Sequence, residues 1–209
     1  MKVSPHKWHD TYAIRARKEG FPARSVYKLE EIQKRFRIIR KGTRVVDLGC
    51  CPGSWLLFAS KVVGRRGEVI GVDLNPLSIS VPSNARVICD DVLTWDPEAL
   101  DGYLGGGIDV VLSDMAPACT GNKFVDVQRS LALCRQALWV STAVLRPGGS
   151  LVCKVFQGED FDQFGKAVRD VFSRTSYVRP KSTRKASKEI YVVGMEKRIT
   201  CGCLSMIKS

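Results

Sequence analysis

Short apolar runs that each lead into a charged residue constrain the fold of this 209-residue chain more than any other feature. The run at 108–112 is followed by Asp114, and the run at 151–153 leads directly into Lys154. Runs of this length are typical of buried strands in a parallel sheet, and open α/β sheets bind ligands at the carboxyl ends of their strands. The pattern therefore predicts that an Asp and a Lys face one crevice of a nucleotide-binding type of fold.

The rest of the chain alternates between strand-like and helix-like patterns. We expect helices where apolar residues recur at helical spacing, at 24–39, 55–63, 97–103, 125–145 and 161–172. We expect seven strands, at 43–48, 68–72, 85–89, 108–112, 150–155, 176–179 and 190–193. Such alternation indicates an α/β fold with a mostly parallel sheet, right-handed crossovers and helices on both faces. The last two strands are joined too briefly for a crossover, so we predict an antiparallel hairpin at the sheet edge.

The length and composition favour one domain over residues 1–197, with a basic N-terminal helical segment at 1–40 and a C-terminal tail at 198–209. No stretch approaches the roughly 18 apolar residues that a membrane span needs, and the N-terminus lacks an apolar secretory core. We therefore expect a cytoplasmic protein with no membrane partner, and a monomer requires no further assumption.

The eight cysteines do not predict a disulfide framework, because no secretion signal accompanies them. Cys201 and Cys203 form a CxC pair, but His6 and His9 are the only histidines and neither stands at zinc-finger spacing. We expect no metal. The tail that carries the pair suggests no role of its own.

The net charge of +12 is unevenly distributed. Residues 1–44 carry +9 and residues 161–209 carry +7, whereas residues 45–160 carry −4. A basic rim around a mildly acidic centre fits a polyanion held at the edges and a small cofactor in the middle. The alternative is an ordinary solvated surface. We favour nucleic acid because both ends are basic and the centre is not.

Residues 45–55 read as a strand, a glycine-containing turn and the start of a helix. Gly49 and Gly53 let the backbone approach a ligand closely, and the helix that follows points N–H groups at it. Because Cys51 stands where the middle glycine of GxGxxG would be, a dinucleotide is disfavoured.

Two acidic residues follow the next strands and strengthen the case for an adenosine-type cofactor. Asp73 is placed to accept hydrogen bonds from ribose hydroxyls, and Asp91 from the adenine amino group. Trp55 is a further candidate contact. The alternative is that the glycines only turn the chain and Asp73 caps a helix.

Five motifs, spread in order from about residue 10 to 195, resemble the FtsJ/RrmJ family of ribose 2′-O-methyltransferases. They are RSVYKLEEI at 24–32, DLGCCPGSW at 47–55, SDMAP at 113–117, GGSLVCKVFQG at 148–158 and SKEIYV at 187–192. The resemblance implies a Rossmann-like S-adenosylmethionine-dependent methyltransferase fold. This chain departs from the family pattern at Cys50 and Cys51, where Ala-Ala is frequent, and at Ser54, where many bacterial members have Gly. We expect neither change to abolish cofactor binding.

The resemblance also implies site residues and a substrate. The family's Lys-Asp-Lys-Glu tetrad falls on Lys28, Asp114, Lys154 and Glu189, and its S-adenosylmethionine contacts on Gly53, Trp55, Asp73, Asp91 and Asp114. SDMAP resembles the ribosomal-RNA branch, whose bacterial type modifies a uridine of large-subunit rRNA. The expected partner is therefore ribosomal RNA or the large ribosomal subunit.

A ribose hydroxyl is a poor acid, so methyl transfer benefits from a base held against it. Our hypothesis is that neutral Lys154 takes the 2′-OH proton as that oxygen attacks the methyl group in line. Asp114 and Glu189 would orient Lys154 and hold the substrate, while Lys28 would position the ribose or a phosphate. The alternative is that Lys154 and Asp114 form only a structural ion pair.

Basic residues precede both Lys28 and Glu189 in the sequence. They are candidate RNA-phosphate contacts, which position RNA without reading its sequence: Arg15, Arg17, Lys18, Arg24, Lys181, Arg184 and Lys185. Three other functions remain open at this point: a tRNA 2′-O-methyltransferase, a non-catalytic RNA-binding ribosome-assembly factor, and a nicotinamide-dependent oxidoreductase, the last disfavoured by the missing glycine.

Overall fold

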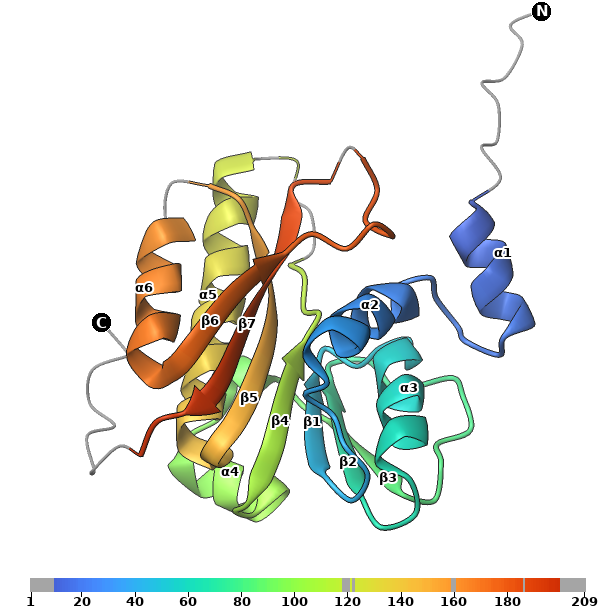
Figure 1. The fold of residues 1–209 in the computed structure, drawn as a ribbon, viewed down its shortest axis with the longest axis horizontal. Helices are drawn as coiled ribbons and strands as arrows, with labels where there is room; N and C mark the ends of the chain where they lie inside the picture. The colour runs from blue at the N-terminus through green and yellow to red at the C-terminus, as the bar shows by residue number, and fades with distance from the viewer. Residues whose placement is uncertain (1–9, 118–120, 122, 159–160, 186, 200–209) are drawn as a thin grey trace, which may run out of the picture.

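The computed structural model describes residues 10–117, 121, 123–158, 161–185 and 187–199 (Figure 1). The cysteines and histidines on which the metal prediction rested, Cys201, Cys203, His6 and His9, lie outside these residues. The five cysteines that the structure describes as thiols are all free: Cys50, Cys51, Cys89, Cys134 and Cys153.

A seven-stranded sheet forms the centre of the molecule, in the order β3-β2-β1-β4-β5-β7-β6. Its strands are β1 (Arg44–Leu48), β2 (Glu68–Asp73), β3 (Ala85–Cys89), β4 (Ile108–Ser113), β5 (Leu145–Phe156), β6 (Phe172–Val178) and β7 (Glu189–Lys197). The first five are parallel, whereas β7 runs antiparallel to both β5 and β6. The mostly parallel sheet with an antiparallel edge is confirmed.

Helices cover both faces of this sheet (Figure 1). The helices are α1 (Thr11–Lys18), α2 (Val26–Phe36), α3 (Ser54–Val63), α4 (Pro97–Leu104), α5 (Lys123–Val144) and α6 (Phe161–Val171), with a 3₁₀ turn η1 (Val92–Thr94). The pair α2 and α3 packs on one face, and α4, α5 and α6 pack on the other. In Figure 1, α1 lies beyond α2, away from the sheet.

Alternating strand residues supply the two halves of the core. On β1, Val45 packs toward α2 and α3, and its neighbour Val46 packs toward the α5 side. On β4, Val110 and Val111 divide in the same way. Because successive side chains of a strand point to opposite faces, both faces are buried, and this is why these strands are apolar without alternation.

The predicted hairpin is present, but its strands are longer than expected and their order in the sheet is informative. β7 is buried along nearly its whole length and lies between β5 and β6. β6 carries several exposed polar residues and forms the edge. A strand that is apolar on both faces belongs inside the sheet, and a polar strand tolerates the edge. β6 begins at Phe172 rather than at the predicted residue 176 because α6 ends one residue earlier.

Among the helices that the structure describes, none combines the length and apolarity of a membrane span.

Candidate active site

A cavity of about 390 Å³ opens at the carboxyl ends of β1, β2 and β4. Four residues predicted from the sequence line it: Gly49, Asp73, Asp91 and Asp114. Cys51, Asn75, Asp90, Leu93, Met115 and Leu133 are among its other lining residues. The cavity is thus acidic and lies where parallel sheets bind ligands.

Gly49 is required by its backbone conformation and by its neighbour. Its φ is +77°, in the left-handed region that favours glycine. A Cβ on this residue would lie 2.6 Å from Met115 Cγ and 3.0 Å from the Met115 Cα. The turn after β1 therefore packs directly against the chain that leaves β4, which brings this turn next to Asp114.

The carboxylates of Asp73 and Asp91 are fixed by backbone amides. Asp73 accepts from the Cys51 amide at 2.9 Å and from the Asn75 amide at 2.9 Å. Asp91 accepts from the Leu93 amide at 2.9 Å and caps η1. Capping and ligand binding are compatible here, because each carboxylate oxygen can accept two hydrogen bonds.

Gly53 and Trp55 do not line this cavity, although the family resemblance assigned them to cofactor binding. Gly53 faces Ile79, whose Cδ1 would lie 2.3 Å from a Cβ at this position. The Trp55 side chain is buried, and its indole N–H donates to the Ser25 carbonyl at 2.8 Å. This bond turns the indole toward the start of α2. A cofactor contact from either residue stays a prediction.

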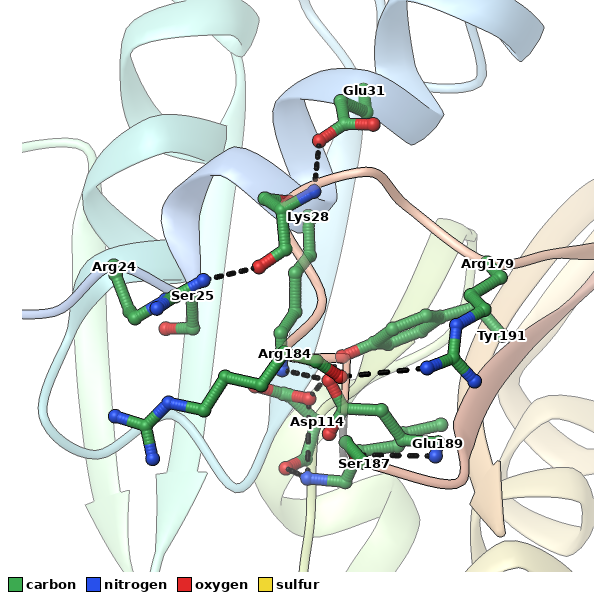
Figure 2. Close-up of polar contacts among 12 residues, drawn as sticks. Arg24, Ser25, Lys28, Glu31, Asp114, Arg179, Arg184, Ser187, Glu189 and Tyr191 are labelled. Carbon is green, nitrogen blue, oxygen red and sulfur yellow. Dashed lines mark hydrogen bonds and ion pairs between the residues drawn. The ribbon is translucent and has the colours of Figure 1, made fainter. Parts of the chain in front are cut away.

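The four tetrad residues come together as two ion pairs at the edge of the cavity, and Figure 2 labels Lys28, Asp114 and Glu189 among them. Lys154 Nζ lies 3.1 Å from Asp114 Oδ1 and 2.5 Å from the Asp114 carbonyl oxygen. Lys28 Nζ lies 2.5 Å from Glu189 Oε1. All four side chains are at most 17% exposed, so water screens these charges poorly.

Strand pairing explains how residues so far apart in the sequence meet. Ser113 of β4 is opposite Cys153 of β5, so Asp114, which follows β4, and Lys154, within β5, lie at the same level of adjacent parallel strands. On the other side of β5, antiparallel β7 places Tyr191 opposite Lys154 and Glu189 opposite Phe156. Lys28 reaches the same point from α2.

The sequence reasoning missed Tyr191 as a site residue. Its hydroxyl donates to Asp114 Oδ1 at 2.7 Å, and its side chain is fully buried. Burial, reinforced by the charges of Asp114 and Glu189, raises the pKa of the phenol well above its ordinary value. The available signal was its spacing: two residues after Glu189 on a strand, a side chain points to the same face.

Asp47, the first residue of the DLGCCPGSW motif, also lies beneath the site. It is completely buried. Burial, followed by the charges of Asp114 and Asp73, raises the pKa of its carboxyl well above the ordinary value. The surroundings of Asp47 thus disfavour a further negative charge below the cavity.

Two basic stretches that are remote in sequence converge beside the tetrad. The 179–188 loop is docked on α2 because Glu31 accepts from the Lys181 amide at 2.7 Å and from the Ser182 amide at 2.9 Å. Arg24 is half-buried; it pairs with Asp10 and donates to the Ser182 carbonyl. The remaining predicted RNA contacts are exposed: Arg15, Arg17, Lys18, Lys181, Arg184 and Lys185.

Residues 21–197 match the family model described as FtsJ-like methyltransferase. The chain belongs to the FtsJ-like methyltransferase family. The family resemblance inferred from the sequence is confirmed.

Curated relatives agree with this membership, and a solved structure shares the fold. A protein of Desulfatibacillum aliphaticivorans named ribosomal RNA large subunit methyltransferase E is 53% identical over 94% of this chain and 95% of its own length. A protein of the same name from Desulforapulum autotrophicum is 47% identical over 94% and 97%. Aeropyrum pernix fibrillarin, solved with natively bound S-adenosyl-L-methionine, shares the fold at a TM-score of 0.61 and 18% identity, over 82% of this chain and 76% of its own.

Proposed function

We propose that this protein transfers a methyl group from S-adenosylmethionine to the 2′-hydroxyl of a ribose in large-subunit ribosomal RNA. The observation that carries the proposal is the buried Lys154–Asp114 pair, which lies beside a second Lys–Glu pair at the edge of an acidic cavity. An amine held by a carboxylate next to a cofactor site is an arrangement suited to moving a proton from a substrate hydroxyl.

The cavity fits the proposed cofactor in its charge and its hydrogen-bonding groups. Asp73 and Asp91 offer carboxylate acceptors for ribose hydroxyls and an adenine amino group, and Gly49 lines the cavity at the turn after β1. The acidic lining suits the positive charges of S-adenosylmethionine, which when bound supplies an electrophilic methyl group. Asp114 lines the cavity and holds Lys154, so it joins the cofactor site to the tetrad.

Each tetrad residue has a role that its contacts support. Lys154, in its neutral form, takes the proton of the 2′-hydroxyl, while Asp114 holds the amine in place through its carboxylate and its carbonyl. Lys28, held by Glu189, positions the ribose or an adjacent phosphate. General-base catalysis of this kind contributes about 10² to 10⁴-fold, and positioning contributes the rest.

The RNA would lie across the exposed basic side chains of α1 and the 179–188 loop, which are joined where Arg184 pairs with Asp10 at the start of α1. Contacts of this kind neutralise phosphates, so affinity should fall steeply as salt rises. The names of the relatives support large-subunit rRNA as the substrate. The choice of a uridine, a monomeric state and a cytoplasmic location belong to the proposal and rest on the sequence.

Transfer of tritiated methyl groups from S-adenosylmethionine tests the proposal directly. The purified protein is offered free rRNA, large subunits and tRNA, and the methylated nucleotide is mapped. Label on a 2′-oxygen of large-subunit rRNA is expected. Label on tRNA would replace the substrate, and absence of transfer to all three would leave a non-catalytic RNA-binding role.

Substitution Lys154→Arg tests the base at saturating cofactor and RNA. A guanidinium stays protonated, so kcat should fall by about 10² to 10⁴-fold while the cofactor still binds. Lys166→Arg is a matched control, because Lys166 is an exposed lysine on α6 and lies outside the site. Near wild-type turnover in Lys154→Arg would refute the base assignment.

A further inference from the structure

Tyr191 lies close to both ion pairs of the tetrad, and Figure 2 labels it near Asp114 and Glu189. Its hydroxyl donates to Asp114 Oδ1 at 2.7 Å, and Lys154 Nζ lies 3.1 Å from the same oxygen. The Asp114 carboxylate is therefore held from two sides: by an amine on β5 and by a phenol on β7. Among the described residues, this fully buried side chain meets the tetrad through one hydrogen bond, from its hydroxyl to Asp114.

The ring of Tyr191 makes contacts with the other half of the site. Lys28 Nζ lies 5.9 Å from its centroid, and the Trp55 ring lies 5.7 Å away at a tilt of 37°. Trp55 in turn donates its indole N–H to Ser25, the residue that precedes α2 and Lys28. Tyr191 thus contacts Asp114 through its hydroxyl. Its ring packs against Trp55, which is hydrogen-bonded to the start of the helix that carries Lys28.

The surroundings of the Tyr191 phenol favour its protonated form, in which the hydroxyl is a hydrogen-bond donor. Burial is the first cause that raises its pKa, and the negative charges of Asp114 and Glu189 add to it. A neutral phenol beside a carboxylate gives a charge-assisted hydrogen bond, which is stronger than a bond between neutral groups. The remaining charged groups at this point are Lys28 from α2 and Lys154 from β5.

We propose that Tyr191 is a positioning residue for methyl transfer: its hydroxyl fixes the Asp114 carboxylate so that Asp114 holds Lys154 in the geometry for proton removal. The inference rests on the proposed function and extends it beyond the four tetrad residues. If Tyr191 only filled the core, losing its hydroxyl would lower stability without a selective effect on turnover.

Substitution Tyr191→Phe tests the role, because it keeps the ring and removes only the hydroxyl. We expect kcat to fall by about tenfold to a hundredfold, the scale of one hydrogen bond to a charged group, while KM for cofactor and for RNA stays near the wild-type values. Tyr27→Phe is the matched control. Tyr27 is also buried, and its hydroxyl donates to a carboxylate, Glu19, at 3.0 Å, but it does not contact Asp114.

A double-mutant cycle separates action through Asp114 from an independent effect. If Tyr191 acts by holding the carboxylate, Tyr191→Phe should cost little further rate in an Asp114→Asn background, in single-turnover assays below the unfolding midpoint of every variant. Wild-type kcat in Tyr191→Phe, an equal loss in the Tyr27→Phe control, or fully additive losses in the cycle would each overturn the positioning role while leaving the methyltransferase intact. Absence of methyl transfer by the wild-type protein would overturn the proposed function itself.

Discussion

The cofactor cavity and the tetrad lie side by side but are assembled in different ways. The cavity is built by turns that follow parallel strands, and its carboxylates are fixed by nearby backbone amides, as Asp73 is by Asn75. The tetrad is built by side chains from α2, β4, β5 and β7 that hold one another. Under the proposed function, cofactor binding would therefore depend on local backbone geometry, whereas catalysis would depend on long-range packing.

Asp114 is the one residue that belongs to both regions. It lines the cavity, and its carboxylate and carbonyl both contact Lys154. A substitution at Asp114 would therefore confuse binding with catalysis. Substitutions that touch only one region can separate them.

The largest expected separation comes from Asp73→Asn. Asn has one acceptor oxygen where Asp has two, so the hydrogen bond from either the Cys51 amide or the Asn75 amide is lost. The remaining neutral oxygen is also a weaker acceptor for a ligand hydroxyl. Cofactor affinity should fall by about tenfold to a hundredfold, the scale of a hydrogen bond to a charged group, while kcat at saturating cofactor stays close to wild type. Calorimetry and steady-state kinetics measure the two effects. Lys154→Arg should give the reverse pattern; a matching pattern would mean that the two regions are one functional unit.

The cavity was the more predictable of the two regions from sequence. Asp73 and Gly49 could be placed because a strand end and a glycine turn are local signals. Neither the docking of the 179–188 loop on Glu31 nor the hydrogen bond from Tyr191 to Asp114 has a local signal, because each joins residues more than 70 positions apart. The family motif identified the tetrad, but it did not reveal which partner each charge takes.

In the fold, too, features with a local sequence signal could be predicted and those set by long-range packing could not. Strand β3 has the predicted bounds, since its apolar run is enclosed by turn residues. The placement of β7 inside the sheet was not foreseen. It depends on β6 and β7 competing for the position beside β5, which is a question of burial rather than of local pattern.

A smaller effect is expected from Asp47→Asn, a substitution of the buried carboxyl that lies beneath the cavity. The folded pKa of Asp47 is raised by burial, so the folded protein keeps a proton that the unfolded chain releases above about pH 4. Stability supplied by this protonated group is therefore lost as pH rises from that value toward the folded pKa. Asn carries no such proton, so the variant should be more stable than wild type near neutral pH, with the difference shrinking toward pH 4.

Denaturant unfolding of both proteins across this pH range measures the difference. An Asn variant that is less stable than wild type at neutral pH, or a difference that does not change with pH, would contradict a buried neutral Asp47.

The smallest expected effect compares two glycines that share a backbone conformation. Gly49 and Gly42 have φ of +77° and +80°, so an alanine is strained at both. An alanine Cβ at Gly42 meets nothing within 4 Å, whereas at Gly49 it meets Met115, including its backbone. Gly42→Ala should cost about 1 kcal/mol of unfolding free energy, and Gly49→Ala about 1 kcal/mol more because the turn must move away from β4.

Only the Gly49 variant should also weaken cofactor binding, because only Gly49 lines the cavity. Equal losses of stability with unchanged cofactor affinity would show that the turn can shift without disturbing the cavity. Binding would then not depend on the close approach of the β1 turn to Met115. A selective loss of cofactor affinity in Gly49→Ala, with kcat at saturating cofactor preserved, would show that this turn serves binding. The geometry of the tetrad would then depend on long-range packing and not on this turn.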